Sequence, residues 1–550
     1  MEADLKPLEF PAIQRMLERL TATPYGADAA RALEPAPTLA VARSLQAAVS
    51  VARQRLEAGT LPEIGMLPDV RPALRQAANP GAALSSQAMN NLQTLMQEAA
   101  RLARSLADAP SIYPGDLGDL LPPEALVLRL REALHAGGTL RDDASPVLAE
   151  AAAERVRLRA EVEQVVRRRL ESLVSDAASR RVQWHQERAV LVLGAELAGD
   201  VKGVRRGSAL GGRDQIIEPI EAVPLNNRLD TVNERIGNEQ QRLLRELTDR
   251  VREHGEVLQR MLGVLTWLDL AFAAGRMSQQ MNAHAPQLHD APGVRLVEAY
   301  HPLLLLQYAE GSGPLPVPLS LELAQGRPLL LITGPNTGGK TVALKTVGLL
   351  VTMAWCGLHI PAEGDCSVGA FDRVMVDVGD HQSLLHHLST FAGHVEVLKR
   401  VLEHAGGSSL ILLDELGTGT DPDEGAALAM AVLDELRSRG VFGIVNTHLA
   451  PLKDYAARHS GILNASMQFD AQRLAPTYRL VPGEPGISFG LTIAEKNGLP
   501  AKLVARAREH LGELPSARAS APAPPLDGRA GEASSRDGAT PQPSAPGTAP

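Results

Sequence analysis

Residues 334–341 read Gly-Pro-Asn-Thr-Gly-Gly-Lys-Thr and match the spacing G-x-x-x-x-G-K-[ST]. The apolar run 328–333 directly before them is typical of a short buried strand, and residues 341–353 are mostly apolar and compatible with a helix. In a strand–loop–helix of this kind, glycines let backbone N–H groups close around phosphates, and the helix N-terminus adds the positive end of its dipole. The stretch therefore predicts a P-loop that binds a nucleoside triphosphate.

Two residues of this loop have specific expected roles. Lys340 is expected to reach the β- and γ-phosphates of ATP, and the Thr341 hydroxyl to hold Mg²⁺. The expected ATP-binding residues are Gly334, Pro335, Asn336, Thr337, Gly338, Gly339, Lys340 and Thr341.

Residues 410–415, Leu-Ile-Leu-Leu-Asp-Glu, predict an apolar strand that ends in two acids. After a P-loop, Asp414 is the expected second ligand of Mg²⁺, and Glu415 fits a general base or water-orienting group. In isolation, two ordinary carboxylates at the end of a buried strand would explain the same pattern.

A later predicted strand, 441–446, ends at Thr447-His448. His448 is a candidate γ-phosphate sensor, and the alternative is a capping or packing histidine.

Four histidines between these strands, His381, His386, His387 and His394, suggest a metal site at first sight. No carboxylate–histidine spacing here matches a known metal motif, so this interpretation is disfavoured.

Composition limits the class of protein. The length of 550 residues suggests about three or four domains, and the 3% of aromatic residues with abundant Ala, Leu, Arg and Glu favours a helix-rich body. The net charge of −9 means that any nucleic-acid surface must be a local basic patch. Cys356 and Cys366 are expected to be free thiols. The N-terminus does not resemble a signal peptide, and no apolar run reaches roughly 18 residues, so a soluble, cytoplasmic protein without membrane contact is expected.

The order of segments predicts a helical arm between two helical regions. Helices are expected up to about residue 140, including 39–56 and 86–107. Two long stretches with apolar stripes, 147–176 and one from 225 onwards, predict an antiparallel coiled coil, and strands expected at 189–193 and 214–218 give it a small β tip. The expected domains are 1–146 (helical), 147–256 (arm), 257–293 (returning helices), 294–512 (α/β with a parallel sheet) and 513–550 (disordered tail).

The arm carries an unusual charge for this chain. Residues 155–213 contain thirteen Arg or Lys and seven Asp or Glu. Phosphate contact by such a stripe is one interpretation, and a solvated helix face with intrahelical Glu–Arg pairs is the other. With Trp184 as the sole aromatic residue there, contact would follow the backbone or shape of a nucleic acid. The candidate nucleic-acid-binding residues are Arg167, Arg168, Arg180, Arg181, Lys202, Arg205 and Arg206.

Several motifs together resemble the MutS family, and its bacterial MutS-two branch in particular. Those around the nucleotide are 334–341, Leu388-Ser389-Thr390-Phe391, 414–422 and Thr447-His448. Those elsewhere are Leu8-Glu9-Phe10, Val201-Lys202-Gly203-Val204, Ile217-Glu218-Pro219 and His301-Pro302-Leu303-Leu304. The resemblance covers about residues 5 to 512.

This resemblance implies an α/β, ABC-like P-loop ATPase domain joined to an all-α lever with a coiled-coil clamp arm. It implies a homodimer with composite sites, in which Ser389 reaches in trans to the γ-phosphate on the partner's P-loop. The chain departs from the family in three ways. First, no Phe-x-Glu is present and no domain precedes the lever, so mismatch reading is not expected. Second, a disordered tail is expected where the branch usually has an Smr nuclease domain, so endonuclease activity is not expected. Third, His381 stands where the branch usually has Glu.

The resulting prediction is a homodimeric ATPase that clamps branched or otherwise non-linear DNA and restrains homologous recombination. A ribosome-associated factor that binds stalled or collided ribosomes through rRNA is the main alternative, since both ligands present phosphate backbones. A transporter ATPase subunit would leave the arm unexplained, and a structure-specific endonuclease lacks an identifiable catalytic cluster outside the nucleotide motifs.

Overall fold

The computed structural model describes most of the chain. The residues that it describes are 1–173, 182–209, 214–334, 339–378, 390–470, 475–484, 491, 494–495 and 498–513. They belong to two compact units, residues 1–487 and residues 488–550. The second unit contains helix α17 (Ala501–Glu513), and every other element named below lies in the first unit.

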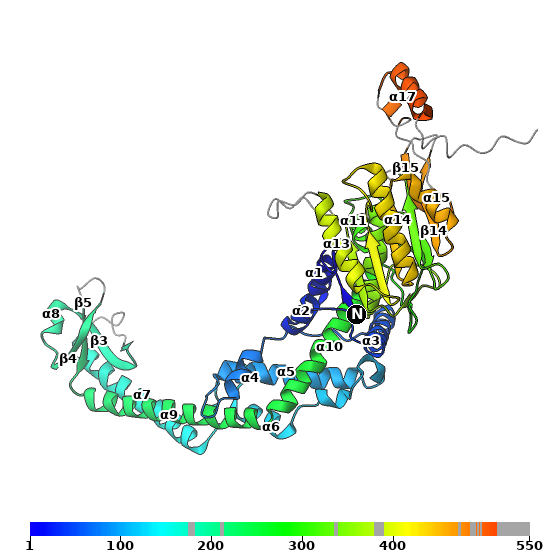
Figure 1. Ribbon diagram of the computed structural model, residues 1–550. Helices are drawn as coiled ribbons and strands as arrows, with labels where there is room; N and C mark the ends of the chain where they lie inside the picture. Colours follow the sequence, from blue (N-terminus) through cyan, green and yellow to red (C-terminus); the bar gives the residue numbers. More distant parts are fainter. Residues whose placement is uncertain are drawn as a thin grey trace, which may run out of the picture. The chain divides into compact units, whose positions relative to one another are not determined.

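A seven-stranded sheet forms the α/β part of the first unit (Figure 1). In sheet order, its strands are β1 (Glu2–Ala3), β11 (Arg373–Asp377), β12 (Ser409–Leu413), β13 (Phe442–Thr447), β9 (Leu329–Thr333), β14 (Ile462–Asp470) and β15 (Ala475–Pro482). All neighbours are parallel except β14 and β15. Strands β9, β12 and β13 are buried along their whole length, which explains why most of their residues are apolar. The predicted parallel sheet is confirmed.

Helices cover both faces of this sheet. They are α12 (Lys340–Trp355), α13 (Thr390–His404), α14 (Pro422–Ser438) and α15 (Ala450–Arg458). Successive residues of a strand point to opposite faces. Accordingly, Leu330 of β9 shares one apolar cluster with Leu344 of α12. Its neighbour Leu331 shares another cluster with Leu433 of α14 and Leu452 of α15.

A second sheet and a short helix flank the P-loop strand in the chain. The sheet has the order β6 (Gln287–His289), β10 (Ser367–Gly369), β7 (Val294–Ala299) and β8 (Leu319–Leu323), and the helix α11 (Pro302–Ala309) connects β7 to β8.

The N-terminal segment is attached to the helix that follows the P-loop. Leu8 packs so closely on α12 that a Cβ at Gly348 would lie 2.4 Å from its Cδ2 atom. Glu9 pairs with Lys345 of the same helix at 2.5 Å. Because β1 also joins the sheet edge beside β11, the Leu8-Glu9-Phe10 motif holds the start of the chain against the nucleotide-binding part.

Helices make up the rest of the first unit outside the arm. They are α1 (Phe10–Leu20), α2 (Pro24–Arg31), α3 (Leu39–Glu57), α4 (Arg71–Ala77), α5 (Ser86–Ser105), η1 (Pro110–Ile112), η2 (Leu117–Leu120), α6 (Glu124–Ala133) and α10 (Gly255–Gln280). The helices expected at 39–56 and 86–107 are therefore confirmed as α3 and α5.

Helix α10 is long and apolar enough to cross a membrane by length and composition, but 56% of its most apolar stretch is buried inside the protein. It is accounted for as a core helix.

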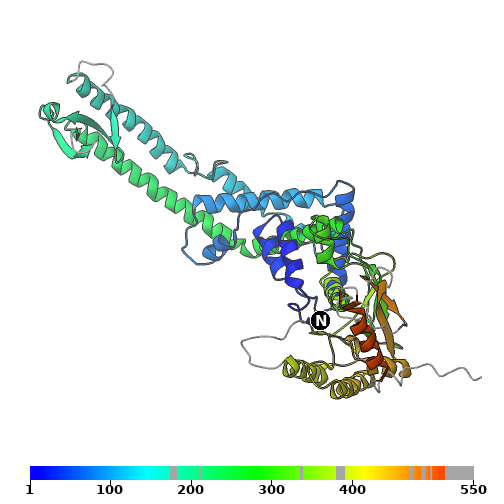
Figure 2. The same ribbon diagram turned by 90° about the horizontal axis from the view of Figure 1, so that it is seen from above.

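Two long helices, α7 (Pro146–Glu171) and α9 (Val223–Glu253), lie side by side and antiparallel (Figure 2). Ion pairs join Glu150 to Arg235 and Glu154 to Arg228, so residue numbers rise along one helix as they fall along the other. Between Ile236 and Leu243, the buried residue of the α9 stripe is the polar Glu239. Hydrogen bonds from Arg242 and then Ser145 hold the pKa of the Glu239 carboxyl at about 2.

A small sheet connects the ends of these two helices. Its order is β2 (Gln183–His185), β3 (Arg188–Gly194), β5 (Asp214–Pro219) and β4 (Gly203–Ala209), with the short helix α8 (Ala195–Ala198) after β3. Strands β3 and β5 confirm the two predicted strands. Strand β4 was not predicted, because its exposed Gly, Arg and Ser residues have no apolar alternation.

Candidate nucleotide-binding site

The P-loop begins at the end of β9 and closes at the start of α12. Gly334 and Gly339 have φ of 135° and 90°, a region where a Cβ would be strained. A Cβ at Gly339 would also lie 3.0 Å from the Tyr478 ring. Four of the expected ATP-binding residues lie outside the residues that the structure describes: Pro335, Asn336, Thr337 and Gly338.

Lys340 opens α12 and is almost fully buried. Its ammonium donates to the carbonyl oxygens of Gly334 at 2.6 Å and Thr447 at 3.3 Å. Burial lowers the pKa of Lys340, while the nearby carboxylates of Asp414 and Glu415 act in the opposite direction. The cation therefore lies between the P-loop and the end of β13, where phosphate oxygens would replace its carbonyl partners.

Thr341 and Asp414 meet at the predicted metal position. Thr341 Oγ1 donates to Asp414 Oδ2 at 2.6 Å, and Asn446 Nδ2 donates to Asp414 Oδ1 at 3.0 Å. A hydroxyl and a carboxylate are the oxygen ligands that Mg²⁺ prefers, and this ion fills its other positions with water and phosphate oxygens. The donor set therefore fits Mg²⁺.

Glu415 follows Asp414 directly, beyond the end of β12. Its φ is 54°, a left-handed conformation that is uncommon for residues other than glycine and that clusters at functional sites. The backbone on either side is held in place, since Asp414 N donates to Asp377 O at 2.9 Å and Leu416 N donates to Asn446 O at 3.0 Å. Glu415 therefore lies at the same edge of the sheet as Lys340, and its carboxylate is near enough to act on the pKa of the Lys340 ammonium.

The other predicted site residues divide between this edge and the part of the chain that is not described. His448 directly follows β13 and is exposed, and its neighbour Thr447 contacts Lys340 through its carbonyl oxygen. Ser389 lies outside the described residues, as do His381, His386 and His387. His394 has a carboxylate partner: its Nδ1 lies 2.9 Å from Oδ2 of buried Asp377, and this bond raises the pKa of the imidazole.

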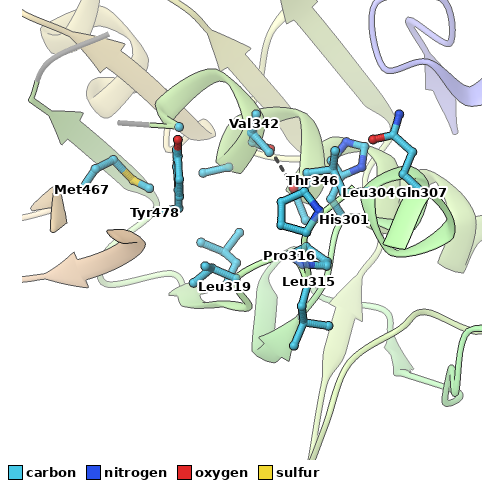
Figure 3. A pocket seen from close by; sticks show the side chains of 15 residues that line it. His301, Leu304, Gln307, Leu315, Pro316, Leu319, Val342, Thr346, Met467 and Tyr478 are labelled. Carbon is cyan, nitrogen blue, oxygen red and sulfur yellow. Dashed lines mark hydrogen bonds between the residues drawn. The ribbon is translucent and has the colours of Figure 1, made fainter. Parts of the chain in front are cut away.

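An apolar pocket of about 250 Å³ opens beside the P-loop (Figure 3). Its walls come from separate segments and include His301, Leu315, Val342, Thr346, Met467 and Tyr478. Tyr478 has φ of 59°, next to a bulge between β14 and β15. Burial lowers the pKa of His301 to about 4, so its imidazole is neutral at pH 7. The pocket has the aromatic and apolar lining that suits a flat heterocycle.

Sequence reasoning missed this pocket. Its residues are scattered from position 299 to position 478, and none but Gly339 belongs to a nucleotide motif. The only available signal was the His301-Pro302-Leu303-Leu304 segment, whose resemblance to a family carried no stated role.

The basic residues predicted for the arm have different environments. Arg206 Nε donates to the fully buried Glu218 at 2.7 Å, and Arg167 pairs with Glu163 at 2.6 Å. Both side chains are therefore engaged in internal ion pairs, and phosphate contact by Arg167 and Arg206 stays a prediction. Arg180 and Arg181 lie outside the described residues.

The remaining three basic residues form a set that we call the tip patch: Arg168, Lys202 and Arg205. They are exposed, and no ion pair joins them to another described residue. Arg169 donates to the carbonyl oxygen of Asp200 at 3.0 Å, which brings the end of α7 beside the turn that precedes Lys202.

Comparison with known proteins identifies relatives of this chain. The family model of MutS domain V matches residues 330–515. The chain is 36% identical over 520 residues to the protein named Endonuclease MutS2 of Symbiobacterium thermophilum, an alignment that covers 93% of this chain and 64% of that protein. It is 37% identical over 515 residues to Endonuclease MutS2 of Thermus thermophilus, covering 92% and 66%. The chain thus spans less than two thirds of the length of these relatives. By similarity along nine tenths of its own length, it belongs to the MutS family, in the branch whose members are named MutS2.

Proposed function

We propose that this chain is an ATPase that binds ATP with Mg²⁺ at the edge formed by β12, β13 and β9. Lys340 binds the β- and γ-phosphates, Thr341 and Asp414 hold Mg²⁺, and Glu415 orients or deprotonates the attacking water. His448 lies beside them as a sensor of the γ-phosphate. The observation that carries the proposal is the contact of Thr341 with Asp414 beside buried Lys340, because it joins the two halves of the site.

The pocket beside Gly339 is the proposed seat of the adenine base. Its apolar walls remove the base from water, and the Tyr478 ring offers an aromatic face on which the base can stack. This assignment extends the site beyond the phosphate-binding motifs.

Removing the Tyr478 ring should weaken ATP binding without altering the chemical step. Tyr478→Ala is expected to raise KM for ATP by about 10-fold, since base–aromatic stacking contributes roughly 1–3 kcal/mol, while kcat changes little. Tyr478→Phe keeps the aromatic ring, and phenylalanine is as strained as tyrosine at the positive φ of this position, so this variant should behave like the wild type. Steady-state ATPase kinetics of both variants provide the check. An unchanged KM in Tyr478→Ala would remove the base from this pocket.

We infer further that α7, α9 and the small sheet act as the clamp arm of a homodimer. Residues 1–146 and 257–293 would form the lever, 147–256 the arm, 294–512 the ATPase domain and 513–550 the tail. ATP would join the two ATPase domains, with Ser389 of each chain reaching the partner's γ-phosphate. Such coupling requires ATP to favour one state of the clamp over the other.

The proposed ligand of the clamp is branched or otherwise non-linear DNA, and the proposed consequence is restraint of homologous recombination. The tip patch supports phosphate contact, because its three cations are exposed and carry no internal partner among the described residues. Neutralising a phosphate releases condensed counterions, which makes such contact favourable and dependent on salt.

Neutralising the tip patch should reduce both the affinity for DNA and its salt dependence. If Arg168, Lys202 and Arg205 each contact one phosphate, their joint replacement by alanine lowers the slope of log K against log salt by about 2 to 3. A matched control removes three exposed arginines outside the arm that also lack a described ion-pair partner: Arg15, Arg104 and Arg131. Binding of a labelled four-way junction is measured for both triple variants at several salt concentrations. Equal slopes in the two would show that net charge, and not the tip patch, sets the affinity.

A further inference from the structure

Asn446 is the last residue but one of β13, between the P-loop strand β9 and the strand β12 that ends beside Asp414. It is fully buried. Its Nδ2 donates to Asp414 Oδ1 at 3.0 Å, and its backbone carbonyl accepts from Leu416 N at 3.0 Å. Its side-chain oxygen, Oδ1, has no hydrogen-bond partner among the described residues.

The chemistry of the pair determines how this amide is oriented. An ionised carboxylate only accepts hydrogen bonds, so the group that faces Asp414 must be the NH₂ of Asn446. The reversed orientation would place two oxygens against each other. Within the described part of the chain, the acceptor Oδ1 is therefore left without a donor, although buried polar atoms are nearly always hydrogen-bonded.

We propose that Asn446 is a positioning residue for the metal–nucleotide site. Its Nδ2 holds one oxygen of the Asp414 carboxylate, so that the other oxygen stays directed to Thr341 and to the cation. Its Oδ1 accepts a hydrogen bond from a water molecule that ligates Mg²⁺. This inference rests on the proposed ATPase function.

The chemistry of Mg²⁺ supports this assignment. The ion keeps several of its waters when it binds to protein carboxylates, and those waters need acceptors around them. Residues that hydrogen-bond to a ligating carboxylate orient it, and their loss typically weakens metal affinity or activity by about 10–100-fold. The amide of Asn446 offers both groups: Nδ2 as the donor to the Asp414 carboxylate and Oδ1 as an acceptor for such a water.

Asn464 shows what distinguishes Asn446 from an ordinary buried amide. It lies on β14, on the other side of β9, and is also buried, with an Oδ1 that has no hydrogen-bond partner in the parts of the chain that the structure describes. Its Nδ2, however, donates to the carbonyl oxygen of Lys453 at 3.0 Å and not to a site carboxylate. An unpartnered oxygen alone therefore does not define the role, and Asn464 is a matched control.

The test is a Mg²⁺ titration of nucleotide binding, which does not depend on turnover. A fluorescent ATP analogue is bound to the full chain in EDTA and then at increasing Mg²⁺, for the wild type, Asn446→Ala and Asn464→Ala. For Asn446→Ala we expect unchanged affinity in EDTA and a Mg²⁺ midpoint raised by about 10-fold or more. For Asn464→Ala we expect the wild-type midpoint.

Each outcome has a distinct meaning. A wild-type midpoint in Asn446→Ala, or an equal shift in Asn464→Ala, would overturn the inference while the proposed function stands. A wild-type protein that does not bind the analogue, or binds it without any effect of Mg²⁺, would instead contradict the proposed function. If Asn446→Ala does not fold, Asn446→Thr supplies the same titration, because a β-branched residue suits the strand and its shorter side chain lacks the amide. A wild-type midpoint in that variant also overturns the inference.

Discussion

Replacing Lys340 with alanine is expected to lower the affinity for ATP by at least about 100-fold and to abolish measurable hydrolysis. The ammonium group is buried, donates to two carbonyl oxygens and lies near two carboxylates, and in the proposed site it binds the phosphates of ATP. Each hydrogen bond to a charged group contributes roughly 1.5–3 kcal/mol, and a tenfold change in affinity corresponds to about 1.4 kcal/mol. Loss of two such bonds therefore accounts for the expected effect. Equilibrium binding of a fluorescent ATP analogue and steady-state turnover measure it.

Lys345→Ala is the matched control for this experiment. Lys345 lies on the same helix, and its ammonium pairs with Glu9 of the N-terminal segment. This pair is partly exposed, so its loss should change the free energy of unfolding by no more than about 1 kcal/mol, with nucleotide affinity unchanged. Wild-type turnover in Lys340→Ala would mean that residues 334–341 are not the ATP-binding loop. Equal losses in both variants would indicate that damage to α12, and not the missing cation, is responsible.

The parts of the fold that could be predicted are those with local patterns. Strands β9 and β12 are apolar runs bounded by motif residues, and the stripes of α7 and α9 repeat every three or four residues. Strand β1 consists of Glu2 and Ala3 only and pairs with a strand some 370 residues away, at Arg373 and Val374. Two residues contain no periodicity, so no local pattern could reveal that the N-terminus joins the sheet.

The residues of the candidate site fall into two groups in the same way: those that a local sequence pattern identifies and those that it does not. Lys340, Thr341, Asp414 and Glu415 could be named in advance because each belongs to a contiguous motif whose chemistry requires that residue type. Asn446 and Tyr478 could not. Asn446 acquires its contact with Asp414 only because β13 is placed beside β12, and Tyr478 reaches the P-loop only because β15 returns antiparallel along β14.

Replacing Glu415 with glutamine is expected to separate ATP binding from ATP hydrolysis. Glutamine has nearly the same shape as glutamate, so the contacts of Lys340, Thr341 and Asp414 should persist and ATP should bind with about wild-type affinity. It lacks the carboxylate that accepts a proton or orients water, and loss of a general base typically costs about 10²–10⁴-fold in rate. Single-turnover hydrolysis and nucleotide binding measure the two effects. Glu403→Gln, an exposed glutamate on α13, should leave both unchanged, whereas wild-type hydrolysis in Glu415→Gln would exclude Glu415 as the base.

The Glu415→Gln protein, held in ATP and Mg²⁺, also identifies the ligand of the proposed clamp. A labelled four-way junction is bound at fixed salt and challenged with linear duplex and, separately, with ribosomes. Because all three present phosphate backbones, the tip patch alone cannot discriminate between them, and preference must come from the shape that the closed clamp accepts. Poor competition by both supports a clamp on branched DNA, whereas displacement by ribosomes at far lower concentration would make the ribosome the working ligand.

The same mixtures also test for nicking of the DNA. Cleavage of the junction that persists in Glu415→Gln would reveal an endonuclease independent of ATP hydrolysis, and the function would then extend beyond ATP-dependent binding.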